Sequence, residues 1–122
     1  MKQIVLDTET TGFRHSDGDR IVEIGCVELE NFLPTGNIFH QYINPERAMP
    51  LDAFKVHGLS NAFLEKFPSI SGIIDDFLNF IGDDSILVIH NAQFDMGFLN
   101  SELKTLGRSQ ISMSRSIDTV KL

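Results

Sequence analysis

Residues 2–12 read KQIVLDTETTG, an apolar run that leads into two acids and a Thr-Thr-Gly sequence. The three aliphatic residues at 4–6 predict a central strand that is buried on both faces. Side chains alternate between the two faces of a strand, so the carboxylates of Asp7 and Glu9 point to the same side. Two anions held this close repel each other, and a hard divalent cation bound through oxygen ligands relieves that repulsion. The alternative is an ordinary strand end with two solvated acids.

Two further strands are predicted downstream from the alternation of side chains. Residues 21–29 and residues 38–43 both alternate in the way that strands do. The Leu-Pro-Thr-Gly sequence at 33–36 predicts the break between them. Because the connections are short, these two segments and the strand at 2–7 are expected to form an antiparallel meander.

The pattern then changes to helices that alternate with strands. Apolar residues at helical spacing predict an amphipathic helix over 70–81, which Gly82 ends. A buried strand is expected at 86–90, and Asn91 then suits the N-cap of the next helix. Residues 116–119 predict a fifth strand that runs into another helix start. Three strands followed by alternating helices and strands predict an α/β domain with a mixed sheet.

Length and composition predict one folded domain over residues 1–122. Of these residues 42% are hydrophobic and 22% are charged, which provides enough apolar material for a core. No apolar run approaches the roughly 18 residues of a membrane span, and no signal peptide is recognisable. The single cysteine, Cys26, cannot form an internal disulfide, so we expect a cytoplasmic protein with no membrane contact.

The chain is acidic. Ten basic and 17 acidic residues give a formal net charge of −7. This balance argues against a broad basic face that binds nucleic acid. It leaves open a small site at which bound metal ions reverse the local charge.

Asp95 is the candidate third ligand. It lies in the first turn or so of the helix predicted after the strand at 86–90. Ligand sites in open α/β sheets gather beyond the carboxyl ends of the strands. If that strand and the first one are parallel neighbours, Asp7, Glu9 and Asp95 converge, and three carboxylates without a cysteine or histidine cluster suit Mg²⁺ or Mn²⁺. The alternative is an acid that stabilises the N-terminus of its own helix.

The segments DTETTG at 7–12 and HNAQFDMGFL at 90–99 follow each other along the chain. They resemble the first two motifs of the DEDD superfamily of 3′-to-5′ exonucleases. Between them, AFKVHGLS at 53–60 is similar to a segment typical of the proofreading epsilon subunit of bacterial DNA polymerase III. The likeness covers residues 2–122. It implies a ribonuclease H-like fold, in which a three-stranded antiparallel meander joins parallel strands and helices, incomplete at the C-terminus.

The resemblance implies a metal-dependent hydrolysis of phosphodiester bonds that releases mononucleotides from a DNA 3′ end. Two ions, Mg²⁺ or Mn²⁺, would clamp the scissile phosphate. Asp7 would bridge both ions, Glu9 would complete one site and Asp95 the other. These three are the expected catalytic residues, and the first two also contact substrate. The DNA polymerase III catalytic subunit and its associated core subunits are the implied protein partners.

By the same resemblance, further residues are expected to contact the terminal nucleotide: Thr10, Asp52, His57 and Phe94. For Thr10 the alternative is a turn hydroxyl, and for His57 it is a solvated loop side chain. Phe94 and Phe13 are suited to stack on bases, although most of the ten phenylalanines are expected in the core.

The third motif of the family, which supplies a general-base histidine and a fourth metal-binding aspartate, has no counterpart in the sequence. Asp118 matches an aspartate that begins a later helix of the family, and four residues follow it. We therefore expect the N-terminal portion of an exonuclease domain, feeble or inactive on its own, because general acid–base catalysis typically contributes about 10²- to 10⁴-fold. Such a chain is expected to expose apolar sheet surface.

Two alternatives remain open. One is an RNA-trimming exonuclease of the same superfamily, although Thr-Thr-Gly at 10–12 and Val-His-Gly at 56–58 favour the replicative type. The other is a non-catalytic remnant of the fold that binds DNA or a polymerase without cleaving. The absent third motif favours this second alternative.

Overall fold

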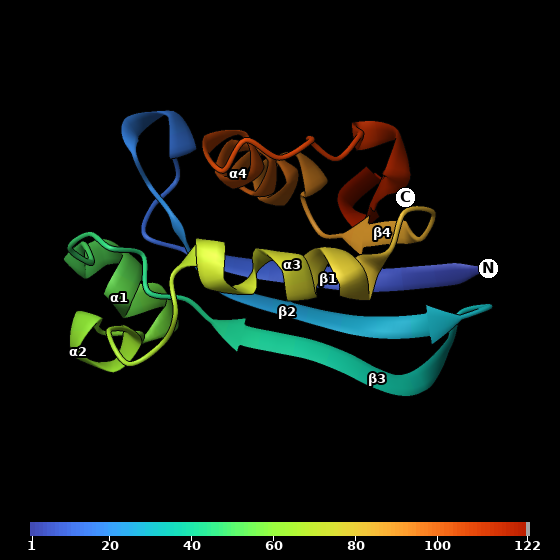
Figure 1. The fold of residues 1–122 in the computed structure, drawn as a ribbon, viewed down its shortest axis with the longest axis horizontal. Coiled ribbons are helices and arrows are strands. Elements are labelled where there is room, and N and C mark those ends of the chain that lie inside the picture. Colours follow the sequence, from blue (N-terminus) through green and yellow to red (C-terminus); the bar gives the residue numbers. More distant parts are fainter. Residues whose placement is uncertain (122) are drawn as a thin grey trace.

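The computed structural model describes residues 1–121, which form a mixed five-stranded sheet (Figure 1). The strands are β1 (Lys2–Thr10), β2 (Ile21–Glu30), β3 (Leu33–Tyr42), β4 (Ile86–Ile89) and β5 (Ser116–Asp118). Their spatial order is β3-β2-β1-β4-β5. β2 runs antiparallel to both β1 and β3, whereas β4 runs parallel to both β1 and β5. The predicted meander and the mixed sheet are therefore confirmed.

α-Helices and short 3₁₀ turns connect the strands. The helices are α1 (Leu51–His57), α2 (Asn61–Leu64), α3 (Ile70–Ile81) and α4 (Ala92–Thr105), and the turns are η1 (His15–Asp17), η2 (Met113–Arg115) and η3 (Thr119–Lys121). Side chains from β1, β4, α3 and α4 belong to a single buried cluster, so both long helices cover the same face of the sheet. No helix among residues 1–121 is long and apolar enough to cross a membrane.

β1 is buried on one face only, and the expectation of two buried faces is wrong. Ile4 and Leu6 lie beneath the helices, whereas Val5 is 41% exposed. Val5 pairs with Val27 of β2, which pairs in turn with Ile38 of β3. Val27 is 42% exposed and Ile38 is 67% exposed. The open face thus carries a row of exposed apolar side chains, as the sequence predicted, because α3 and α4 both lie on the opposite face.

The turn between β2 and β3 comes earlier than predicted. Asn31 and Phe32 have positive φ angles of 51° and 66°, and β3 begins directly afterwards at Leu33. The predicted break at 33–36 is therefore wrong, and Pro34 lies inside the strand. β3 is an edge strand, in which a proline can turn its missing N–H side toward solvent.

α3 follows the sequence prediction at both ends. It spans Ile70–Ile81 and buries Ile73 and Phe77 against the sheet. Gly82 follows with a φ of 64°, a conformation that glycine adopts without strain. The helical spacing of its apolar residues was sufficient to predict this element because one stripe of the helix faces the core.

α4 begins where predicted, with Asn91 at its N-cap position, but the side chain of Asn91 does not cap the helix. Asn91 has a φ of 62° and its side chain makes no capping hydrogen bond. Its backbone N–H instead donates to Asp118 Oδ1 at 3.0 Å, so a side chain from the end of β5 holds the start of the helix. Asparagine adopts this left-handed conformation more readily than most residues.

No sequence pattern predicts α1 or α2. Both helices are short, and Leu51, Phe54 and Val56 of α1 are exposed rather than aligned toward the core. Such a helix lacks the single apolar stripe on which prediction depends. Figure 1 shows the pair at the end of the sheet far from the N-terminus. This is the end at which β1 delivers its acids.

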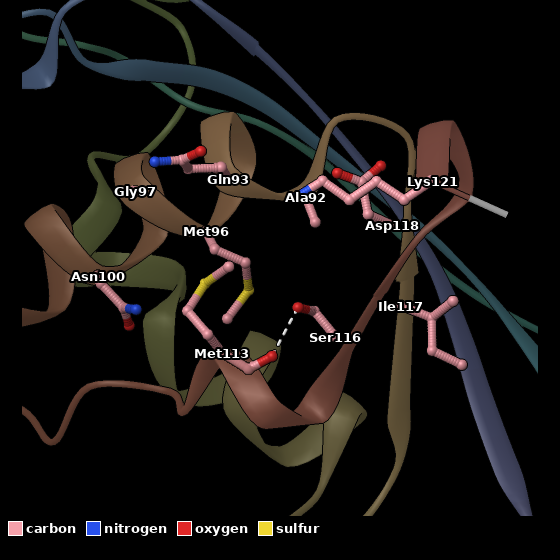
Figure 2. A pocket seen from close by; sticks show the side chains of 10 residues that line it. All are labelled: Ala92, Gln93, Met96, Gly97, Asn100, Met113, Ser116, Ile117, Asp118 and Lys121. Carbon is pink, nitrogen blue, oxygen red and sulfur yellow. Dashed lines mark hydrogen bonds between the residues drawn. The ribbon is translucent and has the colours of Figure 1, made fainter.

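A cavity of about 600 Å³ lies between α4 and β5 (Figure 2). Met96 and Met113 extend into it from α4 and η2, and Ser116 Oγ donates to Met113 O at 2.7 Å. Two flexible thioether side chains thus line the space between the helix and the strand. The hydrogen bond from Asn91 to Asp118 is therefore an important tie between α4 and β5.

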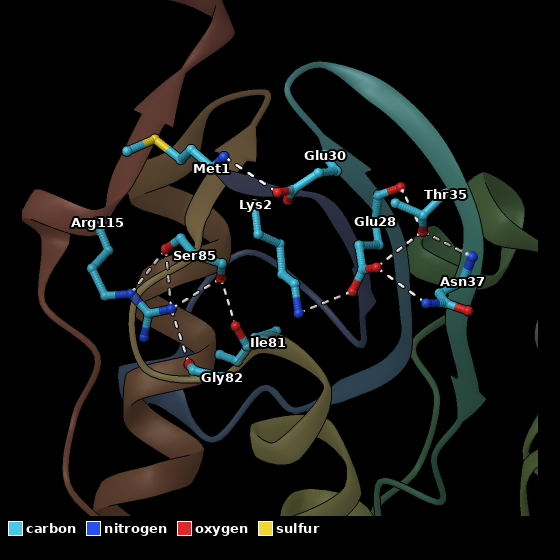
Figure 3. Close-up of polar contacts among 10 residues, drawn as sticks. All are labelled: Met1, Lys2, Glu28, Glu30, Thr35, Asn37, Ile81, Gly82, Ser85 and Arg115. Atoms are coloured by element: carbon cyan, nitrogen blue, oxygen red, sulfur yellow. Dashed lines mark hydrogen bonds and ion pairs between the residues drawn. The ribbon is translucent and has the colours of Figure 1, made fainter.

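Arg115 ties the turn between α3 and β4 to the start of β5 (Figure 3). Its guanidinium donates to the carbonyl oxygens of Ser85 and Gly82 and to Ser85 Oγ, at 3.0–3.1 Å. Ser85 is buried, and its hydroxyl donates to Ile81 O at 2.6 Å. One side chain thus satisfies several acceptors at the end of α3.

Replacing Arg115 by alanine is expected to lower the free energy of unfolding by about 1.5–3 kcal/mol, because hydrogen bonds from a charged donor are lost. Arg108→Ala is the matched control, since it removes only an exposed ion pair with Asp75 and should cost about 1 kcal/mol or less. Urea unfolding followed by far-UV circular dichroism measures both values. Equal losses would contradict the role assigned to Arg115.

Candidate active site

β1 ends in an irregularity that opens a pocket. The register between β1 and β2 shifts between Glu9 and Thr10. The chain then loops through η1 before Arg20 meets Thr11, whose N–H donates to Arg20 O at 2.9 Å. This loop, α1 and the start of α4 surround a pocket of about 690 Å³. Five of the predicted site residues line it: Glu9, Thr10, Asp52, His57 and Phe94.

Asp7 and Asp95 lie beside this pocket. Asp7 and Glu9 line a separate hollow of about 80 Å³ together with Glu23 and Gly25 of β2. Their predicted common orientation is therefore confirmed. Asp95 extends from the first turn of α4 and is 4% exposed. Because β1 and β4 are parallel neighbours, the helix that follows β4 brings this carboxylate to the end of β1.

The carboxylates affect one another electrostatically. Burial, and after it the negative charge of Asp7, raise the pKa of Asp95 to about 7 from an ordinary value of 3.8. Burial and then Asp7 also raise the pKa of Glu9, while the nearby His57 opposes this shift. Asp7 therefore lies close enough to both other acids to destabilise their charged forms. A bound cation would relieve this repulsion.

Two buried oxygens near the acids lack partners. Asp95 Oδ2 and Thr8 Oγ1 make no hydrogen bond, which is costly for buried polar atoms. No three His, Cys, Asp or Glu side chains of residues 1–121 are arranged to hold one metal ion by themselves. Mg²⁺ does not require such a set, because it keeps several waters and takes one or two carboxylates. The oxygen donors thus fit a hard divalent cation, but the side chains form no ready-made three-ligand site.

Thr10 and His57 already have hydrogen-bond partners within the protein. Thr10 Oγ1 donates to Gly12 O at 2.6 Å, which is the turn role. Leu59 N donates to His57 Nδ1 at 3.0 Å, so Nε2 carries the proton and donates to Thr10 O at 3.1 Å. His57 therefore joins α1 to the end of β1 and forms part of the pocket wall. A contact of either side chain with substrate stays a prediction.

Asp19 organises the loop over the pocket, although no sequence pattern distinguishes it from a surface turn residue. Its carboxylate accepts hydrogen bonds from Thr11 Oγ1, Arg14 N and Arg47 Nη1, at 2.9–3.2 Å. Gly12 packs against it so closely that an added Cβ would lie 2.3 Å from Asp19 Oδ2. These contacts join segments that are far apart in the sequence, so only the folded chain shows them.

An exposed aromatic ring stands at the rim of the pocket. Phe13 is 82% exposed, and its ring centroid lies 6.5 Å from that of Phe94 in an edge-to-face arrangement. Phe94 in turn packs against Phe98 at 5.0 Å. Phe98 holds these three rings to the core, while the ring of Phe13 is exposed and can stack on a planar ligand.

The sequence pattern of the RNase_T family, described as exonuclease, matches residues 4–122. The chain belongs to this exonuclease family. Among its relatives, the DNA polymerase III subunit epsilon of Rickettsia felis is 53% identical over 123 residues. That match covers 98% of the chain and 53% of the relative. The exonuclease chain thus spans about half the length of the curated relatives it matches.

Solved exonucleases share its fold. Exonuclease X in complex with 5′ overhanging duplex DNA is 28% identical, with a TM-score of 0.63 over 76% of the chain and 51% of that protein. The nuclease domain of 3′hExo, a DEDDh family member bound to rAMP, has a TM-score of 0.75 over 93% of the chain and 63% of that protein. At 16% identity the second likeness concerns the fold alone. The predicted ribonuclease H-like fold is confirmed.

Asp95→Asn is expected to stabilise the metal-free chain at neutral and higher pH. The carboxyl has a pKa of about 7 in the folded chain and 3.8 as its ordinary value, so the folded state holds the proton more tightly. The protonated Asp95 carboxyl therefore contributes fully to the stability of the folded chain below about pH 4, and this contribution is lost as the pH rises through 7. Asparagine avoids this loss, which is worth roughly 2–4 kcal/mol.

Thermal unfolding in EDTA at pH 5 and pH 8 measures the effect. The stability difference between Asp95→Asn and the unchanged chain should grow with pH. A difference that stays constant over this range would show that burial does not raise the pKa of Asp95.

Proposed function

We propose that the chain carries the active-site acids of a DNA 3′-to-5′ exonuclease that proofreads for a replicative polymerase. The main support is the electrostatic influence of Asp7 on Glu9 and Asp95 near the end of β1, next to a pocket of about 690 Å³ that Glu9 lines. The epsilon-subunit names of the relatives support the link to replication. The DNA polymerase III catalytic subunit and its core subunits are the proposed partners, and the proposed location is the cytoplasm, consistent with the unpaired, buried Cys26.

The proposed cofactors are two Mg²⁺ or Mn²⁺ ions. Asp7, whose charge contributes to the raised pKa of both other acids, is the residue proposed to contact both ions, and Glu9 and Asp95 would each complete one site. Bound ions of this kind activate a water and stabilise the leaving oxygen of a phosphodiester. The charge that they bring also makes an acidic site receptive to a polyanion.

The proposed substrate group is the 3′-terminal nucleotide of a single strand. Phe94 and the exposed Phe13 offer ring faces to the base. Asp52 and His57 contribute the wall formed by α1, and the backbone of Thr10 lies between them and the acids. The complex of exonuclease X with DNA supports a DNA end as the ligand.

The histidines bear on how fast such a site would react. Among residues 1–121, no histidine lines the small hollow at Asp7 and Glu9, and His57 on the wall of the larger pocket is engaged at both nitrogens. The hollow therefore holds no histidine as a general base, a role typically worth about 10²- to 10⁴-fold. We therefore expect nucleotide release by this chain to be slow. A role in binding DNA without cleavage is the second candidate that this observation favours.

Calorimetry with Mn²⁺ tests the metal site. Asp7→Asn keeps the shape of the side chain but removes the shared charge, and it should lower Mn²⁺ affinity at least about tenfold. Glu30→Gln removes an exposed acid at the far end of the hairpin and is the matched control. Equal Mn²⁺ affinity for Asp7→Asn and the unchanged chain would rule out a site at Asp7.

A 5′-labelled DNA oligonucleotide tests the reaction. With Mn²⁺ and excess protein, slow shortening from the 3′ end is expected, and Asp7→Asn should abolish it. Binding without any shortening would favour the non-catalytic candidate instead. Faster shortening of an RNA of the same sequence would favour an RNA-trimming enzyme.

Phe13→Ala is expected to weaken binding of a single-stranded oligonucleotide in the presence of Mn²⁺ by about 5- to 150-fold, the range given by stacking energies of about 1–3 kcal/mol per base. Phe32 is 72% exposed on the β2–β3 turn, so Phe32→Ala is the matched control and should not change affinity. Fluorescence anisotropy measures both. Similar affinities for the two variants would mean that Phe13 does not contact the strand.

A further inference from the structure

Arg20 and Glu102 form an ion pair that links the end of the pocket loop to α4. Arg20 Nε and Nη2 donate to the Glu102 carboxylate at 2.9–3.1 Å. Two parallel donors on one carboxylate fix the relative orientation of the two side chains. Glu102 is 5% exposed, and its carboxylate also accepts a hydrogen bond from Ile21 N at 3.4 Å.

Each partner is fixed to a different part of the site. Arg20 N donates to Thr11 Oγ1 at 3.1 Å, and Thr11 N donates back to Arg20 O at 2.9 Å. Thr11 lies two residues after Glu9. Glu102 lies seven residues after Asp95, two turns further along the same face of α4. The ion pair thus connects the strand end that carries Glu9 to the helix that carries Asp95.

The ion pair of Arg20 and Glu102 opposes an electrostatic repulsion between β1 and α4. Asp7 and Asp95 repel each other when both are charged, and this repulsion acts to push α4 away from β1. At its start, α4 is held by the hydrogen bond from Asn91 N to Asp118 Oδ1. The pair of Arg20 and Glu102 holds the helix beyond Asp95. The aspartate therefore lies between two ties, one from the end of the edge strand β5 and one from the start of the interior strand β2.

We propose that Arg20, acting through Glu102, is a positioning residue that sets the distance of Asp95 from Asp7 and Glu9. It touches neither substrate nor metal. This inference rests on the proposed function, because the distance matters only if the three acids share bound cations. A misplacement of α4 would leave each acid in the protein but spoil their common geometry.

A double variant separates positioning from stability. Arg20→Gln or Glu102→Gln alone leaves a buried group without its partner, so both stability and Mn²⁺ affinity should fall. Arg20→Met combined with Glu102→Leu replaces the pair by apolar side chains, a change that often preserves or increases stability. The bidentate orientation is nevertheless lost. We expect the double variant to unfold at or above the temperature of the unchanged chain, yet to bind Mn²⁺ at least about tenfold more weakly.

Arg108→Gln is the control, since it removes the exposed ion pair with Asp75 far from the acids. It should keep both the stability and the Mn²⁺ affinity of the unchanged chain. A double variant with unchanged stability and unchanged Mn²⁺ affinity would overturn the positioning role of Arg20. A merely structural role predicts that result, because affinity would then follow stability.

A second readout needs no metal. The backbone amide chemical shifts of residues 93–97 report the environment of Asp95 on α4, and they should move in the double variant but not in Arg108→Gln. If the unchanged chain binds no Mn²⁺, the proposed metal site fails while these shifts still test the positioning. Unmoved shifts in the double variant would overturn it.

Discussion

The parallel pairing of β1 with β4 is the contact on which the site depends. Ile4 pairs with Leu87 and Val5 with Val88, so both strands point their carboxyl ends in the same direction. The acids at the end of β1 and the helix that follows β4 therefore meet at one edge of the sheet. A shift of this register by two residues would displace β4 by about 6.6 Å and carry Asp95 away from Asp7. The aliphatic side chains of the core thus fix the position of the charged ones.

The same arrangement places a cost at the site that other contacts must offset. Asp95 is buried with one oxygen unpartnered and faces the charge of Asp7. A carboxylate in this position is expected either to push its helix outward or to take up a proton. α4 is instead attached to Asp118 at its start and to Arg20 through Glu102 further along. Because α4 is rigid between these two contacts, Asp95 stays near Asp7 despite their repulsion, in a position where a cation could bind.

The elements predicted correctly from the sequence are those in which the spacing of apolar residues marks the face that is buried. The stripe around Ile73 and Phe77 is sufficient for α3, and the run before Asp7 is sufficient for β1. The wrong predictions concern local signals that tertiary contacts override: Pro34 lies within an edge strand, and Asn91 is held through its backbone by Asp118. The candidate acids could be named because the alternation of Asp7 and Glu9 along one strand, and the place of Asp95 just after another, are both visible in the sequence. Asp19 and Glu102 could not, because their partners lie across the pocket or on another element, and neither belongs to a periodic pattern.

The acidic balance of the chain constrains how it can hold DNA. Affinity from a basic face would come from many phosphate contacts and would fall steeply with salt. This chain concentrates acids at the end of β1 and offers an exposed ring at Phe13 beside them. In the proposed function, attraction would come from cations held by the acids and from base stacking, both of which would act on a nucleotide in the pocket. Such a site would select a strand end over a continuous strand, because a terminal nucleotide would place its base in the pocket and its phosphate at the acids together.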